Sequence, residues 1–372
     1  MIAPTRVWLN RTYAENVFFI DLLRAAPVEV YATHVDADSP VLAAADHGLL
    51  EPDGLSAEAY VEFALDFCDR HRIDVFLPRL HQLAIARRRA EFTARGTELI
   101  CPPAQAIATF ESKVDGYVAM AAAGLPVPSW HHVRTADELL RAVEELEYAG
   151  EQPCLKPASG AGGEGFRTIT REPFQLGQLA GWPSGSVQLD QLADAIAAAP
   201  EPVDLLVMPY LEGPEVSVDC LADPDGRLLA AVGRSKRSRR RSFTVDPVYL
   251  EPTRRLIETF GMAYLSNVQF RHHRGVPVLL DINTRPSGGL HQLRLCGLNL
   301  PLAAVQLALG RLPALPPADE LLGEDYALVA AIQPILPSLG AAPRQPETLP
   351  EPELLPLPVA AVHQPKPMAA LV

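Results

Sequence analysis

Apolar residues along the first hundred positions follow two different periods. Short apolar runs at residues 7–9, 28–32, 73–78 and 98–101 predict strands, whereas the spacing of apolar positions over residues 57–70 predicts a helix. Strands that alternate with helices indicate a parallel, doubly wound α/β sheet. The segment after the first run lacks the glycine pattern of dinucleotide-binding proteins, so we do not expect the usual dinucleotide site here.

The pattern changes after residue 104. Helical spacing covers residues 104–124 and 136–148, and two apolar runs flank a glycine-rich turn, which predicts a hairpin. Further strands are predicted at 204–208, 215–221, 228–232, 267–270, 276–282 and 327–333. These regions favour α+β units built from antiparallel pairs. From Pro337 onward, frequent prolines exclude a helix or an internal strand, and we expect an extended tail.

Composition narrows the class of protein. No apolar run reaches the ~18–20 residues that a membrane helix needs, and the N-terminus has no secretory pattern. The formal net charge of −13 disfavours a nucleic-acid partner. Five scattered cysteines, with no CxxC pair, are typical of reduced thiols. We expect a cytoplasmic protein with no membrane partner.

Lysine is rare in this chain. Of 32 basic residues, 28 are Arg and four are Lys, at positions 113, 156, 236 and 366. A lysine retained in such a chain marks a candidate site for a compact ammonium, because the planar guanidinium of Arg is not equivalent to it. Chance placement is an even alternative for any one lysine.

The segment CLKPASGAGGEGF, residues 154–166, carries the strongest local signal. A strand delivers Lys156, and four glycines follow within six residues: Gly160, Gly162, Gly163 and Gly165. Exposed backbone N–H groups in such a turn form a concave site for anions, and a nearby Lys adds a point charge. The Lys precedes the loop, so this is not the usual P-loop. A plain hairpin turn is the alternative.

A second motif, DINTRPSGG, suits a divalent cation. Asp281 and Asn283 lie two apart on a predicted strand and therefore face the same way. A hairpin partner with Gln269 adds a third oxygen, and this ligand set suits Mg²⁺. Arg285 follows on the same face, where it can hold a phosphate or a substrate carboxylate bidentately. The alternative is a hairpin with a polar edge.

Two further segments complete the candidate chemistry. LLVMPYLEGPEVSVD, residues 205–219, has the layout of a hinge, whose backbone can bind an adenine edge while Glu215 accepts ribose hydroxyls; an ordinary connection is the alternative. The basic run at residues 233–243 predicts a mobile loop that brings Arg234 and Lys236 to phosphates or to an anionic substrate, rather than to nucleic acid. Among the histidines, His291 is the candidate for a place near substrate.

These motifs, together with FESKVDG around Lys113 and the GLNLPLAAVQLALG segment, occur in the order seen in ATP-grasp enzymes, and the resemblance covers roughly residues 1–312. NVQF, residues 267–270, is most similar to the ATP-grasp halves of the carbamoyl-phosphate synthase large subunit. RPSGG is similar to carboxylate–amine ligases. The resemblance implies a preATP-grasp (Rossmann-like) α/β domain followed by a two-lobed α+β ATP-grasp fold.

The resemblance also implies roles for individual residues. ATP would be bound by Lys113, Lys156, Gly160, Gly162, Gly163, Pro209, Tyr210, Leu211 and Glu215. Mg²⁺ would be held by Gln269, Asp281 and Asn283, and phosphoryl transfer would be assisted by Arg285, Lys236 and Arg234. Two positions depart from the family pattern. Met208-Pro209 stands where Glu or Gln is frequent, and Asp281 replaces the usual Glu, which shortens the reach of the carboxylate.

The expected organisation has four parts: a preATP-grasp domain at 1–105, a small lobe at 106–212, a large lobe at 213–335 and a Pro-rich tail at 336–372. The implied function is an ATP-dependent carbon–nitrogen ligase that phosphorylates a small-molecule carboxylate and joins it to an amine. Bicarbonate activation of the carbamoyl-phosphate type and a non-catalytic ATP-binding partner protein are the alternatives, and a homodimer remains open.

Overall fold

The computed structural model describes residues 3–160, 163–173, 175, 185–317, 320–321 and 325–329. The chain divides into two compact units, residues 1–336 and 337–372, and every described element belongs to the first. The proposed tail, the predicted strand beyond residue 329 and Gly162 lie outside the described residues.

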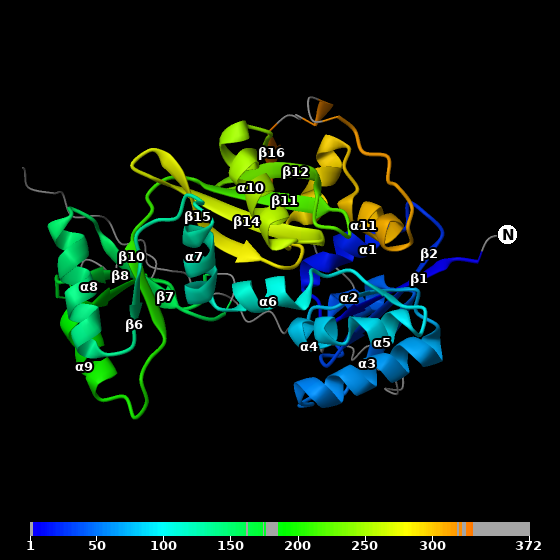
Figure 1. Cartoon of the computed structure of the whole chain (residues 1–372), viewed down its shortest axis with the longest axis horizontal. Coiled ribbons are helices and arrows are strands. Elements are labelled where there is room, and N and C mark those ends of the chain that lie inside the picture. The colour runs from blue at the N-terminus through cyan, green and yellow to red at the C-terminus, as the bar shows by residue number, and fades with distance from the viewer. Residues whose placement is uncertain are drawn as a thin grey trace, which may run out of the picture. The chain divides into compact units, whose positions relative to one another are not determined.

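A five-stranded parallel sheet forms the N-terminal domain, in the order β3-β2-β1-β4-β5. Its strands β1 and β2 are labelled in Figure 1. Its strands are β1 (Thr5–Asn10), β2 (Val28–His34), β3 (His47–Leu50), β4 (Val75–Leu77) and β5 (Glu98–Leu99). Its helices are η1 (Ala14–Asn16), α1 (Val17–Leu23), α2 (Pro40–Ala44), α3 (Ala57–His71), α4 (Gln82–Arg87) and α5 (Arg89–Thr93). The predicted α/β class is confirmed.

Alternation along β1 explains why both faces of this sheet are covered. Val7 and Leu9 join the hydrophobic cluster that includes α1, whereas Trp8 joins the cluster that includes α3. The Trp8 ring stacks on Phe67 and Phe76, with ring centroids 4.3 and 4.0 Å apart. A strand with apolar side chains on both faces is typical of a buried parallel sheet.

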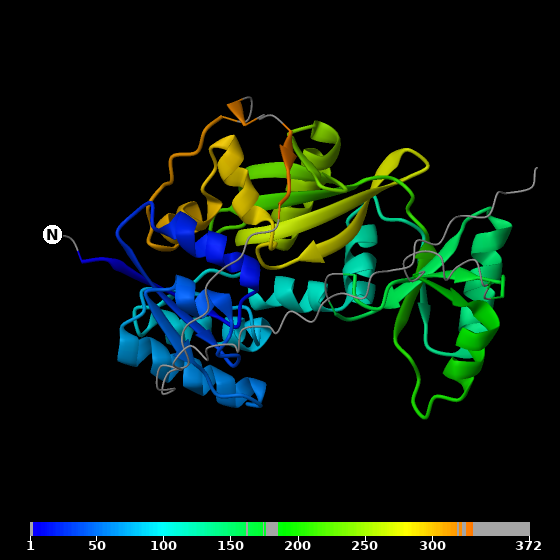
Figure 2. The same cartoon turned by 180° about the vertical axis from the view of Figure 1, so that it is seen from behind.

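The small lobe is a second five-stranded sheet, in the order β6-β10-β7-β8-β9. Its strands are β6 (His131–Val133), β7 (Pro153–Pro157), β8 (Arg167–Thr170), β9 (Ser186–Gln188) and β10 (Leu205–Pro209). Helices α8 (Ala136–Tyr148) and α9 (Leu189–Ala197) pack on it, and α6 (Ala104–Glu111) and α7 (Lys113–Ala122) precede it (Figures 1 and 2). The antiparallel pairing of β7 with β8 is the hairpin predicted around the glycine-rich turn.

A six-stranded antiparallel sheet, in the order β15-β14-β11-β12-β13-β16, forms the large lobe. Its strands are β11 (Glu215–Ala222), β12 (Leu228–Arg237), β13 (Arg240–Thr244), β14 (Tyr264–His273), β15 (Val276–Asn283) and β16 (Tyr326–Ala327). Its helical segments are α10 (Pro247–Phe260), η3 (Leu290–Cys296) and α11 (Leu300–Ala308). Among the described residues, no helix is both long and apolar enough to cross a membrane.

The basic run at residues 233–243 corrects one prediction. We expected a mobile loop, but these residues form the β12–β13 hairpin, in which Arg237 pairs with Arg240 across the turn. Phe243 explains why these residues form a strand and not a loop. Its largely buried ring packs with its centroid 5.7 Å from that of Tyr326 and anchors β13 to the core. The many charged residues led us to predict a loop, although one face of this strand packs on the core.

The N-terminal domain and the large lobe share one hydrophobic core. Phe19 and Ile20 on α1 belong to the same buried cluster as Leu290 of η3 and Leu300 of α11. This contact brings the carboxyl end of β1 close to the segment that follows β15. Side chains far apart in the sequence therefore meet at the candidate site.

Candidate active site

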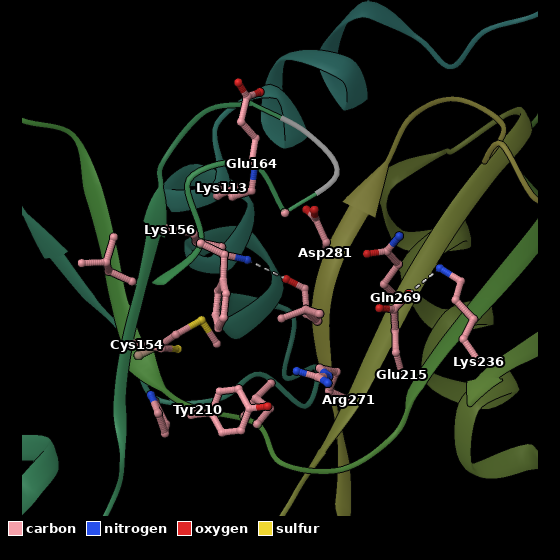
Figure 3. A pocket seen from close by; sticks show the side chains of 17 residues that line it. Lys113, Cys154, Lys156, Glu164, Tyr210, Glu215, Lys236, Gln269, Arg271 and Asp281 are labelled. Carbon is pink, nitrogen blue, oxygen red and sulfur yellow. Dashed lines mark hydrogen bonds and ion pairs between the residues drawn. The ribbon is translucent and has the colours of Figure 1, made fainter. Parts of the chain in front are cut away.

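A cavity of ≈ 350 Å³ lies between the small and large lobes, and we call it the interlobe cavity (Figure 3). Strand β7 and the glycine-rich turn line one side, strands β14 and β15 line the other, and the segment after β10 closes one end. Its charged side chains are Lys113, Lys156, Glu164, Glu215, Lys236, Arg271 and Asp281. Most of the residues expected to bind ATP thus face one space.

Lys156 is the buried cation of this cavity. The side chain points inward from β7, and its Nζ donates a hydrogen bond to the Leu280 carbonyl oxygen at 3.0 Å, which links the two lobes. Burial lowers the pKa of Lys156 to about 8, against the opposing influence of the Asp281 carboxylate. An ammonium with this pKa is charged at neutral pH and gains strongly from an anionic ligand.

Lys113 approaches the same loop from helix α7. It is the first residue of that helix, and its Nζ donates a hydrogen bond to the Gly160 carbonyl oxygen. Gly160 and Gly163 both have positive φ, at 98° and 77°, a backbone conformation that favours glycine. Both residues of the turn therefore occupy the left-handed region, which glycine adopts readily.

The connection after β10 borders the apolar end of the cavity. Pro209 and Leu211 line it, and the Tyr210 N–H donates to the Gln152 carbonyl oxygen at 2.7 Å. Phe166 and Met208 add apolar surface next to them. A slot with apolar walls and a backbone edge suits a planar heterocycle.

Glu215 and Lys236 face each other across β11 and β12. Their side chains form an ion pair of 2.7 Å in the wall of the interlobe cavity. The sequence led us to expect the carboxylate at a ribose and the ammonium at phosphates or an anionic substrate. A ligand that binds either side chain would therefore have to compete with this ion pair.

The proposed metal ligands meet on neighbouring strands. Gln269 on β14 lies directly opposite Asp281 on β15, and Asn283 lies opposite Asn267. Among the described residues, no group of three or more His, Cys, Asp or Glu side chains could hold a metal ion. A cation here would therefore have one carboxylate and amide oxygens, which suits Mg²⁺ because nucleotide phosphates supply the rest of its shell.

Arg285 lies beside these ligands. Its Nη1 donates to the Asn283 Oδ1 at 2.7 Å, and its Nη2 donates to the Tyr13 hydroxyl oxygen at 3.2 Å. An amide oxygen has two lone pairs, so Asn283 can accept from Arg285 and still ligate a cation. Arg285 thus links the DINTR motif, which carries two of the proposed metal ligands, to Tyr13 of the N-terminal domain.

Arg234 lies in a buried network. Its side chain is 2% exposed, its Nε donates to Asp219 Oδ2 at 2.5 Å, and its Nη2 donates to the Ser287 hydroxyl oxygen at 2.8 Å. A Cβ at Gly289 would lie 2.2 Å from Arg234 Nη1, so the glycine gives the guanidinium its room. This geometry favours a residue that positions the RPSGG segment, while a direct phosphate contact stays a prediction.

Sequence reasoning missed three residues. Arg271 lines the interlobe cavity, and Tyr13 and Arg79 line a second cavity next to Arg285. Arg271 lies two positions after Gln269 on β14, so strand alternation could have identified it. Tyr13 and Arg79 follow the carboxyl ends of β1 and β4, which are neighbours in the parallel sheet. Ligands of open α/β sheets bind at that edge, and this rule was the available signal. His291, which we expected near substrate, lines the same cavity as Tyr13.

Comparisons with known proteins bear on the fold that carries this site. Residues 201–326 match a family model described as ATP-grasp in the biosynthetic pathway with Ter operon. No curated protein matches the chain. The matched region covers most of the large lobe, including β11, β14 and the DINTR strand β15.

Solved structures resemble the chain over most of its length. The biotin carboxylase domain of Hydrogenobacter thermophilus 2-oxoglutarate carboxylase, solved with MgADP and bicarbonate, has a TM-score of 0.63 at 14% identity, over 87% of this chain and 73% of that one. Staphylococcus aureus N5-carboxyaminoimidazole synthetase has a TM-score of 0.61 at 14% identity, over 84% of this chain and 79% of that one.

Campylobacter jejuni biotin carboxylase is similar as well, with a TM-score of 0.60 at 16% identity, over 86% of this chain and 73% of that one. Identities this low show a shared fold and leave the reaction open. Together, the family model and these structures confirm the resemblance read from the motifs: the chain has the ATP-grasp fold.

Proposed function

We propose that this protein is an ATP-dependent ligase, which transfers a phosphoryl group from ATP to a carboxylate and joins the activated carboxylate to an amine. One observation carries the proposal: Lys113 and Lys156 of the small lobe and Asp281 of the large lobe face one interlobe cavity. That cavity combines cations for phosphates, an apolar slot for a base and oxygens for a divalent cation.

The residues present fit both ATP and Mg²⁺. Arg271 lines the interlobe cavity with its Nε buried and without a hydrogen-bond partner, so it offers a donor to a ligand oxygen or nitrogen. Lys113, Lys156 and the left-handed glycines would hold the phosphates, and Glu215 would accept from the ribose. Asp281, Gln269 and Asn283 would hold Mg²⁺, whose chemistry is to neutralise charge that develops on the transferred phosphoryl group.

The chain's own residues would mainly position and neutralise. Lys156 would keep its charge against the phosphates, and Arg285 would hold the acceptor carboxylate in line with the terminal phosphate. The carboxylate oxygen then forms a bond to phosphorus and ADP leaves, which gives an acyl phosphate. An amine next attacks the carbonyl carbon, and inorganic phosphate leaves as the amide forms.

Bicarbonate activation is the second candidate, because the Hydrogenobacter structure contains bicarbonate and the other neighbours are carboxylases and carboxyamino-forming synthetases by name. The cavity next to Arg285 has a volume of ≈ 1270 Å³, far more than this small anion requires. The cavity size therefore supports an organic carboxylate as the acceptor.

Two further expectations belong to this proposal. All five cysteines are buried and unpaired, which supports a reducing, cytoplasmic location. The Hydrogenobacter domain is described as a dimer, and a homodimer is the assembly we propose to test first.

The test is metal-dependent release of ADP. The full chain is incubated with MgATP and, one at a time, bicarbonate or members of a panel of organic carboxylates, each with and without amines. We expect an organic carboxylate to stimulate ADP release and EDTA to abolish it. Stimulation by bicarbonate alone would favour the second candidate. ATP binding without release under any condition would favour a non-catalytic partner protein.

A further inference from the structure

The large cavity next to Arg285 is lined by more cationic than anionic side chains, and we call it the basic cavity. It lies where the N-terminal domain meets the large lobe and has a volume of ≈ 1270 Å³. Six cationic side chains line it: Arg79, Arg234, Lys236, Arg239, Arg241 and Arg285. Two carboxylates line it as well, Glu15 and Glu164.

Most of this positive charge has no internal counter-charge. Arg234 is paired with Asp219 and Lys236 with Glu215. Within the described part of the chain, the other four arginines form no ion pair with a carboxylate.

Tyr13 lies between two of these arginines in the contact network. The Arg79 guanidinium carbon is 3.7 Å from the centre of the Tyr13 ring, and that of Arg285 is 5.7 Å from it. Arg285 also donates to the Tyr13 hydroxyl oxygen. A phenol oxygen that accepts a hydrogen bond keeps its own proton free to donate. The three side chains therefore present hydrogen-bond donors to the cavity, and none of them is a negatively charged acceptor.

Arg79 is held in place while its Nε donor is unused. Its backbone N–H donates to Asn10 Oδ1 at 2.7 Å, and its Nη1 donates to the Arg11 carbonyl oxygen at 2.6 Å. Its Nε is buried and has no hydrogen-bond partner. A buried donor without a partner costs free energy, and a ligand oxygen would remove that cost.

The positively charged surroundings of Tyr13 also affect the pKa of its phenol. Burial alone would raise the pKa of this phenol, but the neighbouring guanidinium groups of Arg79 and Arg285 outweigh it and lower the pKa. A neighbourhood that favours a negative phenolate favours any other anion placed there.

Resting on the proposed ligase function, we propose that the acceptor carries a second anionic group, a carboxylate or a phosphate ester, and that Tyr13 and Arg79 bind this group. Arg285 faces the carboxylate that reacts, and the neighbouring pair from the N-terminal domain holds the group that does not. The β12–β13 hairpin contributes Arg239 and Arg241 to the wall of the same cavity. Specificity for a dianionic acceptor would thus come from the N-terminal domain.

The experiment measures anion binding to the full chain by calorimetry, in the presence of Mg²⁺ and a non-hydrolysable ATP analogue. Matched pairs of probes separate the two chemistries: succinate against butyrate, and 3-phosphoglycerate against glycerate. We expect the dianion of at least one pair to bind about tenfold or more tightly than its monoanion, since two charge-assisted contacts replace one. The pair with the larger ratio identifies a carboxylate or a phosphate as the second group.

Variants then assign the preference to residues. Arg79→Ala should abolish the dianion preference, Arg79→Lys should retain part of it, and Tyr13→Phe should weaken it while keeping the ring. Arg141→Ala, which removes one charge from α8 in the small lobe, should leave it unchanged. A wild-type protein with no preference in either pair, or an Arg79→Ala protein that keeps it, would overturn the inference.

The affinity for the ATP analogue separates this inference from the ligase proposal. Tight analogue binding without a dianion preference would reject the second anion subsite and leave the ligase proposal intact. A dianion preference without analogue binding would reject the ligase proposal, although the anion site would stand.

Discussion

The interlobe cavity and the basic cavity adjoin each other, but they differ in how their charges are satisfied. In the interlobe cavity each lysine has a partner within the protein: Lys113 at Gly160, Lys156 at Leu280 and Lys236 at Glu215. In the basic cavity Arg79 has a buried Nε without any partner, and Arg285 is bonded to neutral groups. The lysines of the interlobe cavity are thus held by contacts within the protein, although Arg271 of that cavity also has a buried Nε without a partner. The basic cavity differs in that four of its six cations form no ion pair with a carboxylate in the described part of the chain.

The difference has a structural origin. The interlobe cavity is built from strands and a turn whose backbone carbonyl oxygens hold Lys113 and Lys156. A ligand that binds these lysines would replace those hydrogen bonds. The basic cavity is built from side chains at the junction of the N-terminal domain and the large lobe, with sequence separations of 66 between Tyr13 and Arg79 and 272 between Tyr13 and Arg285.

The largest expected effect comes from Asp281→Asn, which breaks the chemistry of the interlobe cavity. Asp281 is the one carboxylate of the proposed metal set, and the amide retains its size. We expect turnover to fall about 100-fold or more while much of the ATP affinity survives, because the metal acts chiefly on charge in the transition state. ADP formation and nucleotide affinity are measured in parallel, with Gln269→Asn as the milder comparison. Near-normal turnover would remove Asp281 from the metal site.

The next effect concerns stability and separates Arg234 from the unpaired arginines. Asp219→Asn leaves the buried Arg234 charge without its partner, and both side chains are at most 2% exposed. We expect the free energy of unfolding to fall by about 3–5 kcal/mol, measured by chemical denaturation. The exposed pair of Arg171 and Glu147 provides the control, since Glu147→Gln should cost about 0–1 kcal/mol. Equal losses would mean that Arg234 is no more structural than a surface arginine.

Local sequence predicted most of the charged residues that line the interlobe cavity, although not Arg271, and it missed Tyr13 and Arg79 of the basic cavity. Lys156, the glycine turn and the DINTR strand each lie within one short segment, and strand alternation relates Asp281 to Asn283. The β12–β13 hairpin was mistaken for a loop because Phe243 is the one large apolar residue in a run of arginines. Tyr13 and Arg79 lie close together because β1 and β4 are neighbours in the sheet. No local sequence pattern predicts that strand order.

A smaller effect is expected when the Lys156 ammonium is exchanged for a guanidinium. Lys156→Arg keeps the charge, but the planar fork does not fit beside Leu280 in a site that is nine-tenths or more buried. We expect ATP affinity to fall about tenfold. Titration with a non-hydrolysable analogue provides the measurement. Unchanged affinity would show that the choice of lysine is incidental.

The pH dependence of ATP binding tests the same side chain without a change in packing. Burial lowers the pKa of Lys156 to about 8 in the free protein, and bound phosphates should raise it. ATP affinity should therefore be constant below pH 8 and fall above it, by up to about tenfold per pH unit, because binding then requires proton uptake. A Lys156→Met protein should bind weakly with a flatter profile. The same decline in that variant would assign it to another group.

The smallest effect is expected from removing residues 337–372. A proline-rich segment contributes little to a packed core, so truncation after Leu336 should change the free energy of unfolding by no more than about 0.5 kcal/mol. Both cavities should keep their affinities for the ATP analogue and for dianions. A loss of dianion binding alone would mean that the tail contributes to the basic cavity, and a large loss of stability would mean that it packs on the first unit.

The central claim is that the protein phosphorylates a carboxylate, and trapping of the acyl phosphate tests it most directly. Hydroxylamine replaces the unknown amine in reactions with MgATP and the carboxylate panel. The account predicts ADP and a hydroxamate in equal amounts with at least one dianionic carboxylate, and neither product from the Asp281→Asn protein. ADP release without hydroxamate for every acceptor, or no ADP release despite ATP binding, would contradict the account.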